Sequence, residues 1–192
     1  VHVVDVLADK AGIRREHRAV PGRANAAQAQ ADALGLPLWQ VPIPFPCPNG
    51  AYEQAMAAAV RRAVAEGFTH IAFGDLFLED IRRYRATQLA GSGLTPVFPL
   101  FGRDTTTLAH AMVAGGLRAR LTCVDPKVLN PRFVGREFDA ALLDELPTAI
   151  DPCGERGEFH TFAYDGPMFA RPIPVESGEV VEREGFVFAD LT

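Results

Sequence analysis

The stretch DPCGERGEFHTFAYDGPMF, residues 151–169, concentrates ionisable side chains between turn-forming residues. A plain surface loop is usually rich in Ser, Asn and Lys and lacks aromatic residues between its charges, so this stretch is predicted to be half-buried. Glu158 and His160 are two residues apart and would project to one side of an extended segment. A carboxylate beside an imidazole can bind a cation, exchange a proton or orient a nucleophile. The alternative is a histidine hydrogen-bonded in a structural turn.

A second group of candidate residues stands at the end of a strand predicted over residues 69–74. Ligands of open parallel sheets lie beyond the carboxyl ends of the strands, where the next helices present their N-termini. Asp75 could hold Mg²⁺ or a nucleotide phosphate through Mg²⁺ there, and Gly74 would let the ligand approach the backbone closely. The alternative is that Asp75 only caps the following helix.

Further charges lie on that helix, which is predicted over residues 77–91. Glu79, Arg82 and Arg83 are three and four residues apart and are therefore neighbours on the helix surface. This pattern is typical of a solvated ion-pair face, although Glu79 and Arg82 are also candidates for cofactor contacts. The run RREHR at residues 14–18 could touch phosphate or RNA, but it is more typical of a solvated loop.

Strand and helix signals alternate through the first 125 residues. Strands are predicted at 1–7, 36–43, 69–74, 95–101 and 118–124, and helices at 25–34, 51–67, 77–91 and 104–116, the last capped by Asp104. Such alternation predicts an α/β fold with a mostly parallel sheet and helices on its faces. Beyond residue 125 the pattern changes to a helix at 136–146 and a hairpin at 179–191 that turns at Glu184 and Gly185. The predicted domains are thus a nucleotide-binding part, residues 1–125, and a small mixed α+β part, residues 126–192.

The composition excludes several classes of protein. The 192 residues are 48% hydrophobic and 22% charged, which is ordinary for a globular chain, and no apolar run is long enough to span a bilayer. A net charge of −5 argues against a general nucleic-acid binder. Cys47, Cys123 and Cys153 are odd in number and widely spaced, which predicts neither a disulfide framework nor a zinc site and favours a reducing cytoplasm. The first residues do not have the pattern of a signal peptide.

Four segments together resemble the diphthine–ammonia ligase family: FGDLFLEDIRRYR, GLTPVFPLFGRDT, TCVDP and the 151–169 stretch. This family is a branch of the PP-loop ATP pyrophosphatases with a Rossmann-like fold of the adenine nucleotide alpha hydrolase type. The 151–169 stretch is the most specific part of the resemblance, which extends over essentially the whole chain. Its matching residues are Gly154, Glu155, Gly157, Glu158, His160, Thr161, Asp165, Gly166 and Pro167.

The resemblance implies a reaction and a set of site residues. Family members use ATP to convert the carboxylate of diphthine on elongation factor 2 to an acyl-adenylate, and ammonia then displaces AMP. The implied cofactors are ATP and Mg²⁺. The implied catalytic residues are Glu155, Glu158, His160 and Thr161, the cofactor contacts are Gly74, Asp75, Glu79 and Arg82, and the metal ligand is Asp75.

The chain departs from the family pattern at its start. The Ser-Gly-Gly-Lys-Asp-Ser type of PP-loop is absent, the first strand resembles the family's second, and Val20 and Pro21 stand where the family often has His-Gly. The missing strand is expected at the centre of a 3-2-1-4-5 sheet, where its loss leaves two strand edges unpaired. We therefore expect about 25 to 35 further N-terminal residues in the natural protein, the length of one strand, loop and helix. Without the PP-loop, ATP binding weaker than about millimolar is expected.

The leading functional prediction is an ATP-dependent, ammonia-using ligase that amidates a carboxylate. Since the Ala- and Arg-rich composition is typical of GC-rich bacterial genomes and bacteria lack diphthamide, a bacterial relative with another carboxylate substrate remains an alternative. Another is an adenine-nucleotide-binding or alpha-hydrolase protein without the amidation. A third, an RNA-modifying thiolase of the same superfamily, would need paired reactive cysteines. The expected partners are ATP, ammonium, a carboxylate substrate carried on a protein and a second copy in a homodimer, with no membrane.

Overall fold

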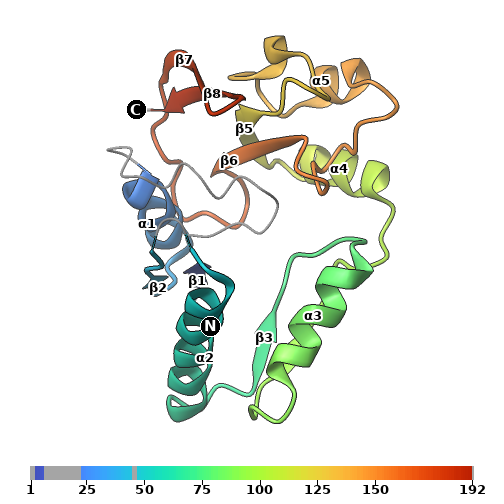
Figure 1. Ribbon diagram of the computed structural model, residues 1–192. Coiled ribbons are helices and arrows are strands. Elements are labelled where there is room, and N and C mark those ends of the chain that lie inside the picture. Colours follow the sequence, from blue (N-terminus) through green and yellow to red (C-terminus); the bar gives the residue numbers. More distant parts are fainter. Residues whose placement is uncertain (1–2, 7–22, 45–46, 192) are drawn as a thin grey trace.

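The computed structural model describes residues 3–6, 23–44 and 47–191, which form a mixed α/β structure (Figure 1). Its helices and strands occur in the predicted order, with one further strand at residues 159–165. They are β1 (Val3–Val6), α1 (Arg23–Leu34), β2 (Leu38–Val41), α2 (Asn49–Ala65), β3 (His70–Ala72), α3 (Glu79–Leu89), β4 (Thr95–Val97), α4 (Thr105–Ala114), β5 (Arg118–Val124), a 3₁₀ turn (Pro131–Phe133), α5 (Ala140–Glu145), β6 (Phe159–Asp165), β7 (Ser177–Arg183) and β8 (Phe186–Leu191). The run at 14–18 and the pair at 20–21 lie outside the described residues.

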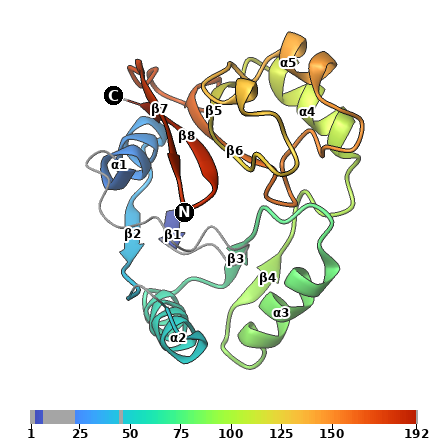
Figure 2. The same cartoon turned by 45° about the horizontal axis from the view of Figure 1, so that its top comes forward.

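The first four strands form two separate parallel pairs. β1 pairs with β2, with Val3 opposite Leu38, and β3 pairs with β4, with His70 opposite Thr95. The predicted parallel pairing is therefore confirmed for these strands. One continuous parallel sheet is not observed in the described part of the chain, because no strand there pairs with both β1 and β3 (Figure 2).

The remaining strands form an antiparallel sheet in the order β6-β5-β8-β7. β5 lies before the boundary predicted near residue 125, yet its partners β6 and β8 both lie after it. The expectation that residues 118–124 extend the parallel sheet is therefore wrong. A short, mostly apolar strand has the same sequence pattern in both kinds of sheet, so only its partners determine its direction. The division of the chain into two domains stays a prediction.

The main hydrophobic core lies around β5. Helices α4 and α5 lie beside this part of the sheet (Figure 1), and Leu121, Phe133 and Leu142 are almost completely inaccessible to solvent. Asp104 caps α4 as predicted, because its Oδ1 accepts a hydrogen bond from the Thr107 amide at 2.7 Å. The C-terminal sheet and its two helices thus form a closely packed unit.

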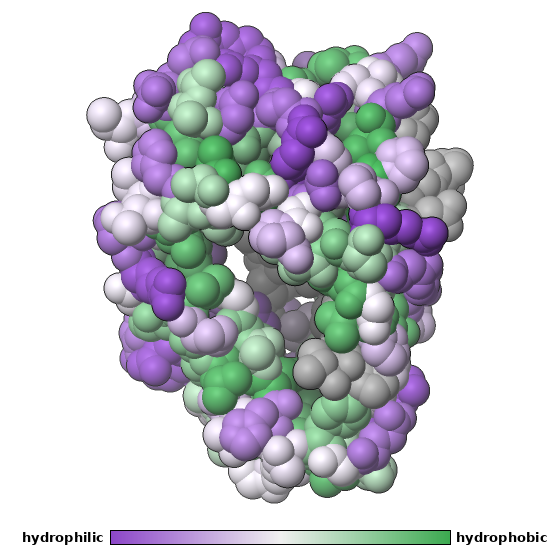
Figure 3. Space-filling view, turned by 180° about the vertical axis from the view of Figure 1, so that it is seen from behind, coloured by the Kyte–Doolittle hydropathy of each residue, from purple (hydrophilic) through white to green (hydrophobic). Residues whose placement is uncertain are grey.

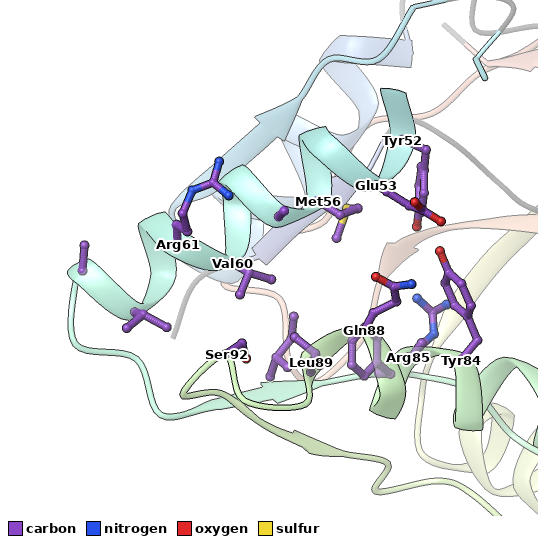
Figure 4. A pocket seen from close by; sticks show the side chains of 15 residues that line it. Tyr52, Glu53, Met56, Val60, Arg61, Tyr84, Arg85, Gln88, Leu89 and Ser92 are labelled. Carbon is purple, nitrogen blue, oxygen red and sulfur yellow. The ribbon is translucent and has the colours of Figure 1, made fainter. Parts of the chain in front are cut away.

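Helix α2 is packed differently, because none of its residues is buried. Its predicted apolar stripe, Met56, Ala59, Val60 and Ala63, is only half-buried. Met56 and Val60 line a largely apolar groove of about 420 Å³, whose other walls include Ile71 of β3 and Leu89 of α3. Figure 4 shows these α2 side chains facing α3 across the groove, and Figure 3 shows hydrophobic side chains beside the hollows of the molecule. No helix among the described residues is both long and apolar enough to cross a bilayer.

The β7–β8 hairpin turns at Glu184 and Gly185, as predicted. Their φ angles are 48° and 85°, and two positive φ angles at the centre of a two-residue turn are those of a type I′ turn. Among the described residues, Glu184 is the only residue other than glycine with a positive φ. A glutamate in this conformation is strained, whereas asparagine tolerates it.

We expect Glu184→Asn to raise the free energy of unfolding by about 0.5 kcal/mol, because it relieves this strain. Chemical denaturation would measure the change. Glu182→Asn, at an exposed position within β7, is the matched control and should give no gain. A lower stability for Glu184→Asn would contradict the assignment of the turn.

Candidate functional site

Buried carboxylates hold the backbone of the turn at residues 151–158. The Glu158 side chain accepts hydrogen bonds from the Asp151 amide at 3.1 Å and from the Arg156 amide at 3.0 Å, one with each oxygen. Asp151 Oδ2 in turn accepts a bond from the Glu155 amide at 2.8 Å. Asp151 and Glu158 are each only 5% exposed. Both carboxylates therefore obtain donors from the turn itself, as buried charged groups require.

Glycine at position 154 is required by the shape of this turn. Its φ angle is +69°, and a Cβ atom there would lie 2.8 Å from the carbonyl oxygen of Phe159. Phe159 belongs to the hydrophobic core and begins β6. The turn is therefore fixed against the core of the C-terminal sheet.

Glu155 connects the turn to the loop that follows β3. Its Oε1 accepts a hydrogen bond from the Leu76 amide at 2.8 Å, across 79 residues of sequence. Burial raises the pKa of the Glu155 carboxyl, and the negative charges of Asp75 and Asp151 act in the same direction. The amides of Leu76 and Phe77 oppose this shift by donating to the ionised form. The predicted catalytic stretch therefore does reach the carboxyl end of a parallel strand.

Asp75 lies at this junction and is only 9% exposed. Its carboxylate pairs with Arg85 of α3, with Oδ2 2.7 Å from Nε and Oδ1 3.2 Å from Nη2. The alternative that Asp75 caps α3 is wrong, because the N-cap residue is Leu78 and no side chain caps the helix. Arg85 was not among the predicted site residues, although its position three residues after Arg82 on the helix was a usable signal.

The other predicted cofactor residues lie nearby in the sequence. Glu79 and Arg82 form an ion pair at 2.7 Å with side chains 53% and 42% exposed, so the ion-pair interpretation is confirmed. This hydrogen bond lowers the pKa of Glu79. Gly74 is exposed, and a Cβ atom added there would meet no other atom within 4 Å. The backbone at Gly74 is thus open to a ligand, as the sequence suggested.

The side chains around Asp75 offer few ligands to a magnesium ion. The described residues contain no group of three or more His, Cys, Asp or Glu side chains arranged to hold a metal ion. Asp75 offers one carboxylate, and Arg85 contacts both of its oxygens. A magnesium ion held by one carboxylate therefore needs phosphate oxygens and water for its other ligands, which is its usual mode of binding beside nucleotides.

His160 and Thr161 lie beyond the turn, in β6. His160 is half-buried opposite Cys123 of β5, and Thr161 is exposed. Their catalytic roles, and those of Glu155 and Glu158, stay predictions. The turn brings the two glutamates together with Asp151, which lies in the same stretch but was not among the predicted site residues.

A polar cavity of about 380 Å³ adjoins the turn. Arg103 and Arg156 line it with exposed side chains, together with the hydroxyl-bearing residues Thr105, Thr106 and Thr148. The two aspartates on its wall, Asp104 and Asp151, accept hydrogen bonds from backbone amides. The arginines were not among the predicted residues, although Arg156 lies within the 151–169 stretch.

Known proteins share the part of the chain that carries this turn. Residues 104–190 match the family model described as the diphthamide synthase C-terminal domain. Diphthine–ammonia ligase of Homo sapiens is 31% identical over 120 residues, which cover 59% of this chain and 45% of the human protein. Residues 104–190 thus carry the match to the diphthamide synthase C-terminal domain, and the chain is similar to diphthine–ammonia ligases.

Two further ligases are similar to the chain. The diphthine–ammonia ligase of Danio rerio is 32% identical over 120 residues, or 59% of this chain and 47% of that protein. The ligase of Schizosaccharomyces pombe is 35% identical over 95 residues, or 47% of this chain and 16% of that protein. The chain thus spans less than half the length of these relatives. Because the relatives carry the ligase name, the non-ligase alternative is not favoured.

The cysteines do not have the features of a thiolase of the wider superfamily. Among the described residues, Cys47, Cys123 and Cys153 form no disulfide. Burial raises the pKa of Cys153 to about 11, and Asp151, Glu155 and Asp104 add to the shift. Its thiol also donates to the Thr105 carbonyl at 3.4 Å. A high pKa disfavours the nucleophilic thiolate.

We expect native Cys153 to react with iodoacetamide at pH 8 roughly a hundredfold more slowly than Cys153 in the unfolded chain. The reason is that a pKa of about 11 leaves only about one thiolate in a thousand at this pH. Mass spectrometry of the peptide that contains Cys153 would follow the reaction. The denatured protein is the control, and equal rates in the two states would contradict the raised pKa.

Proposed function

We propose that the protein is an ATP-dependent ligase that amidates a carboxylate with ammonia. A carboxylate oxygen attacks the α-phosphorus of ATP and releases pyrophosphate, and ammonia then attacks the acyl carbon and releases AMP. The observation that carries the proposal is the 2.8 Å hydrogen bond from Leu76 to Glu155, which joins the family's motif to the carboxyl end of β3. Ligands of parallel sheets bind at such strand ends.

We also propose that the two parallel pairs belong to one Rossmann-like sheet of the adenine nucleotide alpha hydrolase type. Support comes from the parallel direction of both pairs and from the apolar stripe of α2, which is only half-buried. A further strand between β1 and β3 would pair with both and cover the groove. In the family, that strand leads into the PP-loop. Residues 1–125 would then be the nucleotide-binding part, and residues 126–192 the substrate side.

The nucleotide lies at the loop after β3 in this proposal. The open backbone at Gly74 allows the phosphates to approach, and Asp75 supplies one carboxylate to the magnesium ion that they carry. Glu79 and Arg82 lie at the start of α3, where the helix dipole favours a negatively charged ligand.

The carboxylate substrate, carried on a protein, enters the polar cavity. Arg103 and Arg156 can bind its carboxylate, and the threonine hydroxyls can orient it. His160 accepts the proton that ammonium must lose before it can attack. Its position in β6, directly after the turn, supports this role.

Replacement of Gly74 tests the site of the nucleotide. We expect Gly74→Ala to weaken the binding of Mg·ATP roughly tenfold in the full-length protein, because the new methyl group obstructs the phosphates. Thermal unfolding should not change, since a Cβ atom there meets no protein atom. Gly50→Ala is the matched control, because Gly50 is also exposed, without neighbours and free of a positive φ. Calorimetry showing equal affinities for the two variants would place the nucleotide elsewhere.

Replacement of His160 tests the amidation step. We expect His160→Ala to slow AMP release by roughly a hundredfold, with ammonium and diphthine-modified elongation factor 2 as substrates, because a general base is lost. Affinity for Mg·ATP should barely change. Glu158→Gln should instead lower the free energy of unfolding, since an amide has one acceptor oxygen where the carboxylate uses two. Normal AMP release by folded His160→Ala would support the structural-turn interpretation.

A further inference from the structure

The peptide groups on both sides of Leu76 are held by residues from two other loops. The Leu76 amide donates to Glu155 Oε1 at 2.8 Å, and its carbonyl accepts from the Gly102 amide at 2.7 Å. Gly102 belongs to the loop after β4, and Glu155 belongs to the turn at residues 151–158. Three loops therefore meet at Leu76, which is itself buried.

The backbone of Glu155 is held in place by the carboxylates of the turn. Glu158 binds the amides of Asp151 and Arg156, Asp151 binds the amide of Glu155, and the Glu155 side chain binds Leu76. Each carboxylate thus fixes the backbone of the residue that carries the next carboxylate. The series begins at the hydrophobic core beside Phe159 and ends at the loop that carries Asp75. These hydrogen bonds thus fix the position of that loop relative to the core.

The neighbouring residue strengthens the same contact. The guanidinium of Arg156 lies 5.1 Å from the centre of the Phe77 ring. Glu155 and Arg156 therefore contact Leu76 and Phe77, two consecutive residues, through a hydrogen bond and a cation–π interaction. Between them they determine where residues 74–78 lie relative to the turn.

We propose that Glu155 is a positioning residue, which holds the loop at residues 74–78 so that Gly74 and Asp75 face the nucleotide. This inference rests on the proposed function, because that function places the nucleotide at this loop. It differs from the catalytic role that the family resemblance implies for Glu155. The carboxylate is engaged with a backbone amide, so its task is to accept a hydrogen bond rather than a proton from a reactant.

The two roles differ in how they tolerate glutamine. A positioning residue needs one acceptor oxygen, which the side-chain amide of Gln provides, and Gln also removes a charge that Asp75 and Asp151 repel. A general base needs the ionisable group, which Gln lacks. Ala removes the acceptor and leaves the Leu76 amide without its partner.

The experiment compares Glu155→Ala, Glu155→Gln and the control Glu179→Ala in the full-length protein. Glu179 is an exposed residue of β7. Hydrogen exchange would be measured at the Leu76 and Phe77 amides, and steady-state kinetics would be measured with Mg·ATP, ammonium and diphthine-modified elongation factor 2. We expect Glu155→Ala to speed exchange roughly tenfold and to raise KM for Mg·ATP by a similar factor, with kcat changed less than about threefold. Glu155→Gln and Glu179→Ala should resemble the wild type in both measurements.

Three results separate the possible outcomes. Unchanged exchange at Leu76 in Glu155→Ala would overturn the positioning role. So would a Glu155→Gln variant with normal exchange and KM but a kcat reduced roughly a hundredfold, which is the behaviour of a general base. If the wild type shows no ammonia-dependent AMP release while Glu155→Ala still loosens Leu76 and weakens Mg·ATP binding, the positioning role stands and the amidation of diphthine fails.

Discussion

The need of buried carboxylates for hydrogen-bond donors determines the structure around the candidate site. Asp151 and Glu158 are almost fully buried, and an ionised carboxylate without donors would be very costly there. The turn supplies these donors from its own backbone, which forces it into one compact shape. In that shape Glu155 extends toward the loop after β3. This set of bonds is therefore one of the links between the two parts of the chain, beside the bond from the Gln30 side chain to the Ala163 carbonyl.

The chain combines two parts with different packing. The antiparallel sheet has a contiguous hydrophobic core with α4 and α5, and the family model matches this same region from residue 104 onward. The parallel pairs are short, and α2 buries no side chain completely. Since burial of apolar area is the main stabilising contribution, the C-terminal part is expected to be the more stable one. The turn at residues 151–158, which is fixed against this core, therefore gives the candidate site one rigid wall.

The candidate site was predictable in part. Asp75 and Gly74 were found because they end a strand in an alternating pattern, and residues 155–161 because their ionisable types cluster in one stretch. The partners of these residues were not found. Arg85 reaches Asp75 only because α3 folds back beside the preceding loop, and the Leu76 amide has no side-chain signature at all.

The sequence by itself determined the local features of this protein. The order of helices and strands, the Asp104 cap and the hairpin at Glu184 and Gly185 depend on residues a few positions apart, whose propensities and hydrogen bonds are readable from neighbours. The tertiary structure alone decided that β5 joins an antiparallel sheet and that Glu155 binds a residue 79 positions away. These choices depend on which distant segments satisfy a strand edge or a buried amide, and hydrophobic patterning carries no information about the identity of such partners.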